Sequence, residues 1–222
     1  MSEISHLGVG ADQEKLFSLE ERIVLFGSQS ESLSDFYDLA MELNLQPICI
    51  DNLDKIILKS VHNSIHYKNL DPSYLSMPTV LTVISPEKRA SALSHAIKLG
   101  FVNFPPYINP SSAISKSARI NKGVFINSSS IIGSNVTLHN FVTINVGANI
   151  SHDVVIQEFT HIAPSACILG SVSIGSGVTI GANATILPKL QIGNNAVIGA
   201  GSVVTCDVLP GQIVYGNPAR AK

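Results

Sequence analysis

The stretch NISHDVVIQEFTHIAP, residues 149–164, contains the side chains of this sequence that are best suited to chemistry. His152 and Asp153 are adjacent, and His161 follows nine residues after His152. An imidazole can remove a proton from a nucleophile near neutral pH, and a neighbouring carboxylate can orient the ring. The pattern predicts proton transfer at a site that these residues share, with a solvated carboxylate as the alternative role for Asp153.

The segments that must position these residues repeat every six residues. The 17 positions reached from Ile108 in steps of six are all aliphatic, and 15 of them are isoleucine. They are Ile108, Ile114, Ile120, Ile126, Ile132, Leu138, Ile144, Ile150, Ile156, Ile162, Ile168, Ile174, Ile180, Ile186, Ile192, Ile198 and Val204. A period of six fits neither an α-helix nor a flat strand, and it is typical of the hexapeptide β-helix.

In such a β-helix, three hexapeptides form one triangular coil of 18 residues. The aliphatic side chain fills the interior, and a smaller residue four positions later leaves room for the chain to turn. The predicted fold is therefore mainly β: a left-handed parallel β-helix over residues 108–209, preceded by a small α/β domain with a parallel sheet. We expect the core of the β-helix to end near Val204 and residues 210–222 to form a tail.

The sequence before the repeat predicts an α/β domain over residues 23–107, after an arm at residues 1–22. Apolar runs predict strands, and apolar residues at helical spacing predict helices. The strands are expected at 22–27, 46–51 and 79–84, the helices at 32–43 and 85–99, and a loop at 67–78. The segment that joins the second and third strands has no clear pattern.

Polar residues follow two of these strands, at the edge where parallel sheets bind ligands. They are Gly27, Ser28, Asp51 and Asn52. We interpret them as a substrate site. The alternative is that Gly27 only turns the chain and Asp51 only caps a loop.

The composition excludes several classes of protein. Charged residues make up 14% of the chain and the net charge is −2, so a nucleic-acid-binding surface is not expected. Cys49, Cys167 and Cys206 are odd in number and lack CxxC spacing, which favours a reducing cytoplasm over a disulfide framework. The amino terminus has no apolar signal-peptide core, and no apolar run is long enough to span a membrane.

The length of the coil predicts which residues meet. Gly170 follows His152 by 18 residues and should stack on it, whereas His161 lies half a coil away. Asn145 precedes His161 by 16 residues and should lie near the same edge, one coil below. One subunit cannot bring His152 and His161 together, but three β-helices around a threefold axis would pair them at each interface. The sequence therefore predicts a homotrimer with three shared sites.

The segments ISHDVVIQEFTHIAPSACILGSVSIG and GAGSVVTCDV and the tail VYGNPAR resemble a known family. It comprises the NeuD-like sialic acid O-acetyltransferases and the PglD-like bacillosamine N-acetyltransferases, and the resemblance covers residues 22–222. It implies an acetyl-CoA-dependent acetyltransferase that modifies an amino sugar or sugar nucleotide in surface-glycan biosynthesis. The identity of the acceptor, and the choice between N- and O-acetylation, remain open.

The resemblance also assigns roles to residues. It implies that His152 is the general base, that Asp153 orients it, and that His161 and the N–H of Gly170 lie beside the acetyl thioester. Asn145 would line the same site, and Gly27, Ser28, Asp51 and Asn52 would bind the acceptor. No metal is implied. The residues expected to bind coenzyme A, besides His161 and Gly170, are Ala182, Ala200, Pro218 and Arg220.

The sequence departs from this family after the first strand. Relatives have a G-x-x-G-x-G-like turn there, which approaches the nucleotide of the acceptor, but residues 27–32 read GSQSES. Ser30 and Ser32 would crowd the backbone approach, and Glu31 would repel a diphosphate. The acceptor is therefore another nucleotide sugar, a sugar without a nucleotide, or a different compound.

Two other classes compete with the acetyltransferase. A γ-type carbonic anhydrase has the same β-helix and holds zinc with three histidines, for which His139, His152 and His161 are candidates. Their spacing does not match that family, which also lacks the amino-terminal α/β domain. The second competitor is a non-catalytic scaffold that retains the fold. The altered turn at residues 27–32 favours it slightly, and the retained His152, His161, Gly170 and tail oppose it.

Overall fold

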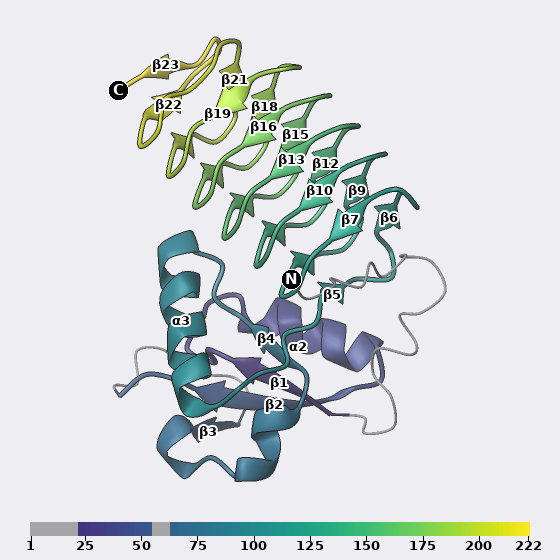
Figure 1. The fold of residues 1–222 in the computed structure, drawn as a ribbon, viewed down its shortest axis with the longest axis vertical. Coiled ribbons are helices and arrows are strands. Elements are labelled where there is room, and N and C mark those ends of the chain that lie inside the picture. The colour runs from purple at the N-terminus through teal and green to yellow at the C-terminus, as the bar shows by residue number, and fades with distance from the viewer. Residues whose placement is uncertain (1–21, 55–62) are drawn as a thin grey trace, which may run out of the picture. The chain divides into compact units, whose positions relative to one another are not determined.

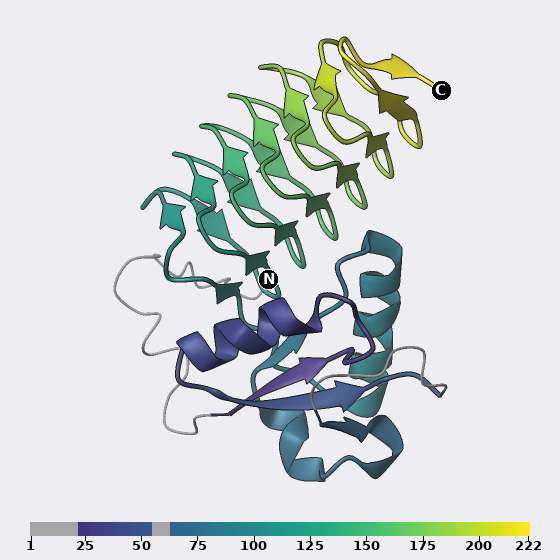
Figure 2. The same cartoon turned by 180° about the vertical axis from the view of Figure 1, so that it is seen from behind.

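The computed structural model describes residues 22–54 and 63–222, which form two compact units. One unit contains the described residues up to Pro105, and the other begins at Pro106 and continues to Lys222 (Figures 1 and 2). The arm predicted for residues 1–22 lies outside the described residues, except for Arg22, which begins the first strand.

The first unit is an α/β domain with a four-stranded parallel sheet in the order β3-β2-β1-β4. The strands are β1 (Arg22–Phe26), β2 (Gln46–Asp51), β3 (Ser64–His66) and β4 (Thr79–Leu81). The α-helices are α2 (Leu33–Glu42) and α3 (Pro86–Leu99). β1, β2, β4 and both helices lie where the apolar patterns predict them. In the part of the chain that the structure describes, no helix is both long and apolar enough to cross a membrane.

The segment between β2 and β4 differs from the expectation. β3 was not predicted, because three residues with exposed or half-buried side chains give no apolar run. The expected loop at residues 67–78 contains two 3-10 helices, η1 (Tyr67–Asn69) and η2 (Pro72–Ser76). Each begins with a side chain that accepts a backbone N–H: His66 accepts from Lys68, and Asp71 accepts from Ser73. These are capping interactions of the kind that begin helices.

Helix α3 begins with Ser85, Pro86 and Glu87, and it ends at Gly100 with a φ of 103°. This matches the sequence signals, although the Ser85 side chain makes no capping hydrogen bond. The buried side chain of Arg89 donates from Nη1 to the carbonyl oxygen of Ile84 at 2.7 Å. This bond ties the first turn of α3 to the segment that leaves β4.

The second unit is a left-handed parallel β-helix with three sheets (Figure 1). The first contains β5, β8, β11, β14, β17, β20, β22 and β23, the second β6, β9, β12, β15, β18 and β21, and the third β7, β10, β13, β16 and β19. The bounds are β5 (Tyr107–Ile108), β6 (Ala113–Ile114), β7 (Arg119–Ile120), β8 (Phe125–Ile126), β9 (Ile131–Ile132), β10 (Thr137–Leu138), β11 (Thr143–Ile144), β12 (Asn149–Ile150), β13 (Val155–Ile156), β14 (His161–Ile162), β15 (Cys167–Ile168), β16 (Ser173–Ile174), β17 (Thr179–Ile180), β18 (Thr185–Ile186), β19 (Gln191–Ile192), β20 (Val197–Ile198), β21 (Val203–Val204), β22 (Ile213–Tyr215) and β23 (Arg220–Ala221). Paired residues such as Thr137 and Val155 are 18 positions apart, as the predicted coil requires.

The aliphatic positions of the repeat form one buried core. The smaller residue four positions after an isoleucine also points inward, as Val154 does after Ile150. The core continues through Val208 and Val214 to Ala219, so the expectation that it ends near Val204 is wrong. The physical reason is that β22 pairs with β20 and adds a further rung, on which β23 folds back in antiparallel pairing.

Turn residues adopt the left-handed backbone region at a fixed place in the repeat. Asn135 and Asp153 lie three positions after their isoleucines, with φ values of 58° and 59°. Asparagine and aspartate tolerate this region better than most residues, because their short polar side chains bond locally. The side chains at these turns lie outside the core.

Adjacent isoleucines provide a test of the core. We expect Ile132→Ala to lower the free energy of unfolding by about 2–5 kcal/mol, because Ile132 is 1% exposed and its loss leaves a cavity. Ile131→Ala, the control, should cost less than about 1 kcal/mol, because Ile131 is 48% exposed. Denaturant unfolding of both variants measures the difference. Equal losses would contradict the predicted inward and outward facing of the repeat.

Candidate functional site

His152 and Asp153 form a hydrogen-bonded pair in the turn between β12 and β13. The distance from His152 Nδ1 to Asp153 Oδ2 is 2.8 Å. Side chains of adjacent residues would face opposite ways along a strand, but the left-handed φ of Asp153 turns the two toward each other. The hydrogen bond from His152, and then that from Asn135, hold the pKa of the Asp153 carboxyl below its ordinary value. The carboxyl group is therefore charged near neutral pH.

Gly170 packs against the His152 ring, as the coil length predicts. A Cβ atom at Gly170 would lie 2.6 Å from both Cε1 and Nε2 of His152, closer than real Cβ contacts come. The backbone fixes this stacking, since Ser171 N–H donates to the His152 carbonyl oxygen at 2.9 Å. The absence of a side chain at Gly170 therefore lets the Cε1–Nε2 edge of the ring approach the backbone of the next coil.

Asn145 and His161 lie next to each other on another part of the coil. Asn145 follows β11, and its N–H donates at 2.9 Å to the carbonyl oxygen of Ile162 in β14. The half-buried His161 belongs to the same sheet as β11, whereas His152 follows β12 in a different sheet. The structure therefore places Asn145 near His161, beside one sheet, and places His152 beside another.

Two donors fix the orientation of the Asn145 amide. Its Oδ1 accepts the Val146 N–H at 2.7 Å and the Asn127 side-chain amide at 3.2 Å. Because a backbone N–H can only donate, the acceptor must be the oxygen of Asn145 and not its nitrogen. The Nδ2 hydrogens are then the groups that Asn145 offers to a ligand.

The residues expected to bind coenzyme A continue the edge that carries Asn145. Ala182 and Ala200 occupy the turns after β17 and β20, which belong to the same sheet as β11. Gly201 N–H donates to the Ala182 carbonyl oxygen at 2.8 Å, so these two turns stack. Pro218 and Arg220 are exposed in the hairpin formed by β22 and β23.

A cavity of about 560 Å³ lies at the carboxyl edge of the parallel sheet in the first unit. Its lining includes Gly27 and Asn52, together with residues 29–32 of the altered turn. Ser28 and Asp51 are buried and do not belong to the lining. Asp51 instead accepts hydrogen bonds from the Gln29 side chain at 2.9 Å and from Leu53 N–H at 3.0 Å. Its role in the structure is to hold two walls of the cavity together.

The turn at Gly27 requires glycine. Its φ is 108°, which side chains other than glycine rarely adopt, and a Cβ would lie 2.9 Å from Cγ2 of Val83. This explains why the first glycine remains although the rest of the glycine-rich turn is absent.

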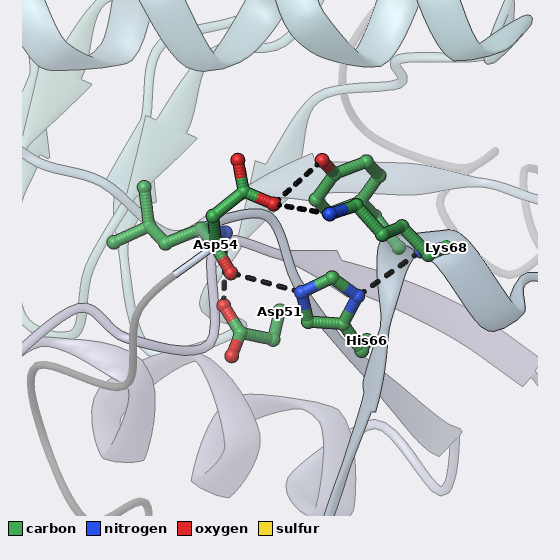
Figure 3. A network of polar contacts seen from close by, with 6 residues as sticks. Asp51, Asp54, His66 and Lys68 are labelled. Atoms are coloured by element: carbon green, nitrogen blue, oxygen red, sulfur yellow. Dashed lines mark hydrogen bonds and ion pairs between the residues drawn. The ribbon is translucent and has the colours of Figure 1, made fainter.

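A polar network fixes the segment after β2 that carries Asn52 (Figure 3). His66 Nδ1 accepts the Lys68 N–H at 3.2 Å, which leaves Nε2 to donate to the Leu53 carbonyl oxygen at 3.1 Å. The Asp54 carboxylate contacts Lys68 Nζ at 2.7 Å and accepts from Tyr67 Oη at 2.9 Å. The network therefore connects the loop beside the cavity to β3 and η1.

The sequence did not single out Lys88 and Ser91 of α3, which also line the cavity. The available signal was the predicted start of α3 at residues 85–87, because a helix that follows a strand begins at the ligand-binding edge. Lys88 and Glu31 give the lining one charge of each sign.

The three histidines considered as zinc ligands lie in, or shortly after, strands of three different sheets. His139 follows β10, His152 follows β12, and His161 lies in β14. Among the residues that the structure describes, no three histidine, cysteine, aspartate or glutamate side chains of one chain are grouped so that they could hold a metal ion.

Comparisons with known proteins bear on the repeat and on the fold. The family "Bacterial transferase hexapeptide (six repeats)" matches residues 153–188 and 171–206. A search of curated protein sequences finds no match.

Solved structures are similar over nearly the whole chain. The acetyltransferase domain of PglB from Neisseria gonorrhoeae FA1090, in complex with acetyl coenzyme A, is 25% identical with a TM-score of 0.81, over 92% of this chain and 100% of that one. PerB from Caulobacter crescentus, in complex with CoA and GDP-perosamine, is 23% identical with a TM-score of 0.78, over 90% and 96%. WeeI from Acinetobacter baumannii AYE is 22% identical with a TM-score of 0.70, over 90% and 99%.

Residues 153–206 are thus hexapeptide repeats of the bacterial transferase type, and the chain has the fold of the hexapeptide acyltransferases. The resemblance to the NeuD-like and PglD-like family is confirmed in the repeat and in the fold.

The packing of Gly170 on His152 is testable without an assay. In Gly170→Ala, the new Cβ should displace the imidazole and break its bond to Asp153. Without the hydrogen bond from His152, the charged form of the carboxyl group is less favoured. The pKa of Asp153 should therefore rise toward its ordinary value. An NMR pH titration of the carboxyl carbon measures this change.

A double variant provides the control. In a His152→Ala background there is no ring to displace, so Gly170→Ala should then leave the pKa of Asp153 unchanged. An unchanged pKa in the single Gly170→Ala variant would contradict the packing.

Proposed function

We propose that this protein is an acetyl-CoA-dependent acetyltransferase that acts on an amino sugar or sugar nucleotide, with His152 as the general base. The observation that carries this proposal is the His152–Asp153 pair at 2.8 Å, with the free ring edge against Gly170. The match to an acetyltransferase domain crystallised with acetyl coenzyme A, at 25% identity over that whole chain, supports the cofactor.

The pair determines which imidazole nitrogen acts. The Asp153 carboxylate accepts a hydrogen bond from the Nδ1–H of His152, so Nε2 carries the lone pair that can take a proton. As the acceptor amine or hydroxyl attacks the thioester carbonyl carbon, its proton passes to Nε2. The resulting imidazolium then returns that proton to the thiolate of coenzyme A when the C–S bond breaks, so the imidazole ends each cycle neutral.

The transient oxyanion needs hydrogen-bond donors. The N–H of Gly170 is the donor that the family resemblance assigns to the thioester, and the Asn145 Nδ2 hydrogens are oriented for a ligand by the bonds to its oxygen. Donors that are fixed before the reaction stabilise developing charge without reorganising. The fixed amide of Asn145 fits such a role.

We propose that each site lies between two subunits of a homotrimer. His152 and Gly170 of one subunit would face Asn145 and His161 of its neighbour, since these pairs follow strands of different sheets within one chain. Coenzyme A would then follow the edge through Ala182 and Ala200 to Pro218 and Arg220. Three equivalent sites per trimer result from this symmetry.

The acceptor is proposed to bind in the cavity of the α/β unit, which Gly27 and Asn52 line. PerB was solved with GDP-perosamine, a sugar nucleotide, at 23% identity to this chain. The negative charge of Glu31 in the cavity wall would repel a diphosphate bound beside it. The positive charge of Lys88 in the same wall can pair with one phosphate or carboxylate. A panel of amino sugars, their phosphates and their nucleotides, assayed for acetyl-CoA turnover, tests the acceptor class.

The role of His152 is testable on whichever acceptor is turned over. We expect His152→Ala to reduce kcat by about 10²- to 10⁴-fold, the typical cost of losing a general base. Acetyl-CoA affinity and the fold should be retained, because the His152 side chain is 63% exposed and its loss opens no core cavity. Turnover assays and calorimetric titration of acetyl-CoA measure the two effects.

His139→Ala is the matched control, since it removes a partly exposed imidazole from another turn of the β-helix. It should keep wild-type turnover. Near-normal turnover by His152→Ala would contradict the general-base assignment.

Hydration of carbon dioxide that depends on all three histidines would favour the carbonic anhydrase instead. Failure of the wild-type protein to bind acetyl-CoA would favour the non-catalytic scaffold.

A further inference from the structure

Asn135 lies one coil below Asp153, at the same position of the repeat. Its Nδ2 donates to Asp153 Oδ1 at 3.1 Å, while His152 Nδ1 contacts the other carboxylate oxygen at 2.8 Å. The two oxygens of Asp153 are therefore held by two different donors. Rotation of the carboxylate about its Cβ–Cγ bond would break both hydrogen bonds.

The second donor matters because Asp153 is accessible to water. Its side chain is 50% exposed, so water competes with His152 for hydrogen bonds to the carboxylate. A single bond to His152 would therefore leave other rotamers of Asp153 populated. A second charge-assisted hydrogen bond selects the rotamer in which Oδ2 faces Nδ1. Both bonds lower the pKa of Asp153, with that from His152 the larger cause.

The backbone under the pair is rigidly stacked. Asp153 N–H donates to the Ser134 carbonyl oxygen at 2.8 Å, and Asn135 N–H donates to Ser117 Oγ at 3.0 Å. A Cβ at Gly133 would lie 2.9 Å from the backbone nitrogen of His152, so the lower turn approaches the upper one closely. The turn at residues 133–135 is thus held in a fixed position against the turn that contains His152 and Asp153.

We propose that Asn135 is a positioning residue for the transfer reaction: it anchors the Asp153 carboxylate so that this carboxylate holds the His152 imidazole with Nε2 free to accept a proton. The inference rests on the proposed role of His152 as the base. Asn135 itself contacts neither substrate nor the reacting atoms, and it acts through Asp153. It adds to the pair a third residue that the sequence motif does not contain.

The chain offers a matched control for this role. Asn140 Nδ2 donates to Glu158 Oε1 at 2.9 Å, again from one coil to the residue 18 positions later. Asn135→Asp and Asn140→Asp are therefore the same substitution in the same kind of hydrogen bond. Only the hydrogen bond of Asn135 involves a member of the His152–Asp153 pair. Aspartate tolerates the left-handed φ of 58° at Asn135, so the fold should survive.

The first readout is independent of activity. In Asn135→Asp, a carboxylate replaces the donor beside Asp153, so the pKa of Asp153 should rise. Nitrogen NMR of the imidazole should show a loss of the single tautomer with hydrogen on Nδ1. Asn135→Gly, which keeps the turn and deletes the side chain, should cause smaller changes in the same direction. Asn140→Asp should leave the pKa of Asp153 and the imidazole spectrum unchanged.

The second readout is kinetic. We expect Asn135→Gly to lower kcat by about 2- to 10-fold, the equivalent of one net hydrogen bond, with the KM for acetyl-CoA unchanged. Asn135→Asp should lower kcat further, and Asn140→Asp should leave it unchanged. Unchanged Asp153 titration and unchanged kcat in both Asn135 variants would overturn the proposal. If the Asn135 variants show the altered NMR readouts but the wild-type protein has no transferase activity, the proposed function is refuted and the positioning of Asp153 by Asn135 still holds.

Discussion

The rest of this structure depends on one geometric constraint: in the β-helix, residues 18 positions apart lie on top of each other. The constraint stacks the isoleucines into a continuous core. Outside the core it places the backbone of Gly170 against the ring of His152, and it places Asn135 under the carboxylate of Asp153. The same spacing puts Asn127 under Asn145, where it fixes the side-chain amide. Stability and the geometry of the candidate site thus come from the same repeat.

The repeat made the β-helix predictable, because an unbroken period of six fits neither an α-helix nor a flat strand and is typical of this fold. Coil arithmetic also predicted that Gly170 meets His152. It could not predict the contact between His152 and Asp153, which depends on the left-handed φ of Asp153. The end of the core was misplaced, because Val214 and Ala219 join it through a new rung and a reversed strand that do not follow the repeat. β3 and the network around His66 depend on capping and side-chain bonds that leave no apolar pattern.

In the proposed function, the two units have different roles. In the β-helix, the residue types that the chemistry requires are present and brought together in pairs, and the matches to acyltransferases cover this region. In the α/β unit, the backbone at position 27 has a φ that requires glycine, and Glu31 and Lys88 are charged residues in the lining of the cavity. In the proposed function, the stacked turns of the β-helix therefore carry out the reaction, and the lining of the cavity in the α/β unit selects the acceptor.

The most direct test of the shared-site account is complementation between two inactive subunits. His152→Ala and His161→Ala chains, each assayed alone, should transfer little acetyl group. When they are co-expressed in equal amounts, about three quarters of the trimers contain both chains, and each of these has one interface with both histidines intact. Recovery of about a quarter of wild-type turnover is the predicted result. No recovery in trimers shown by mass spectrometry to be mixed would contradict a site built from two subunits.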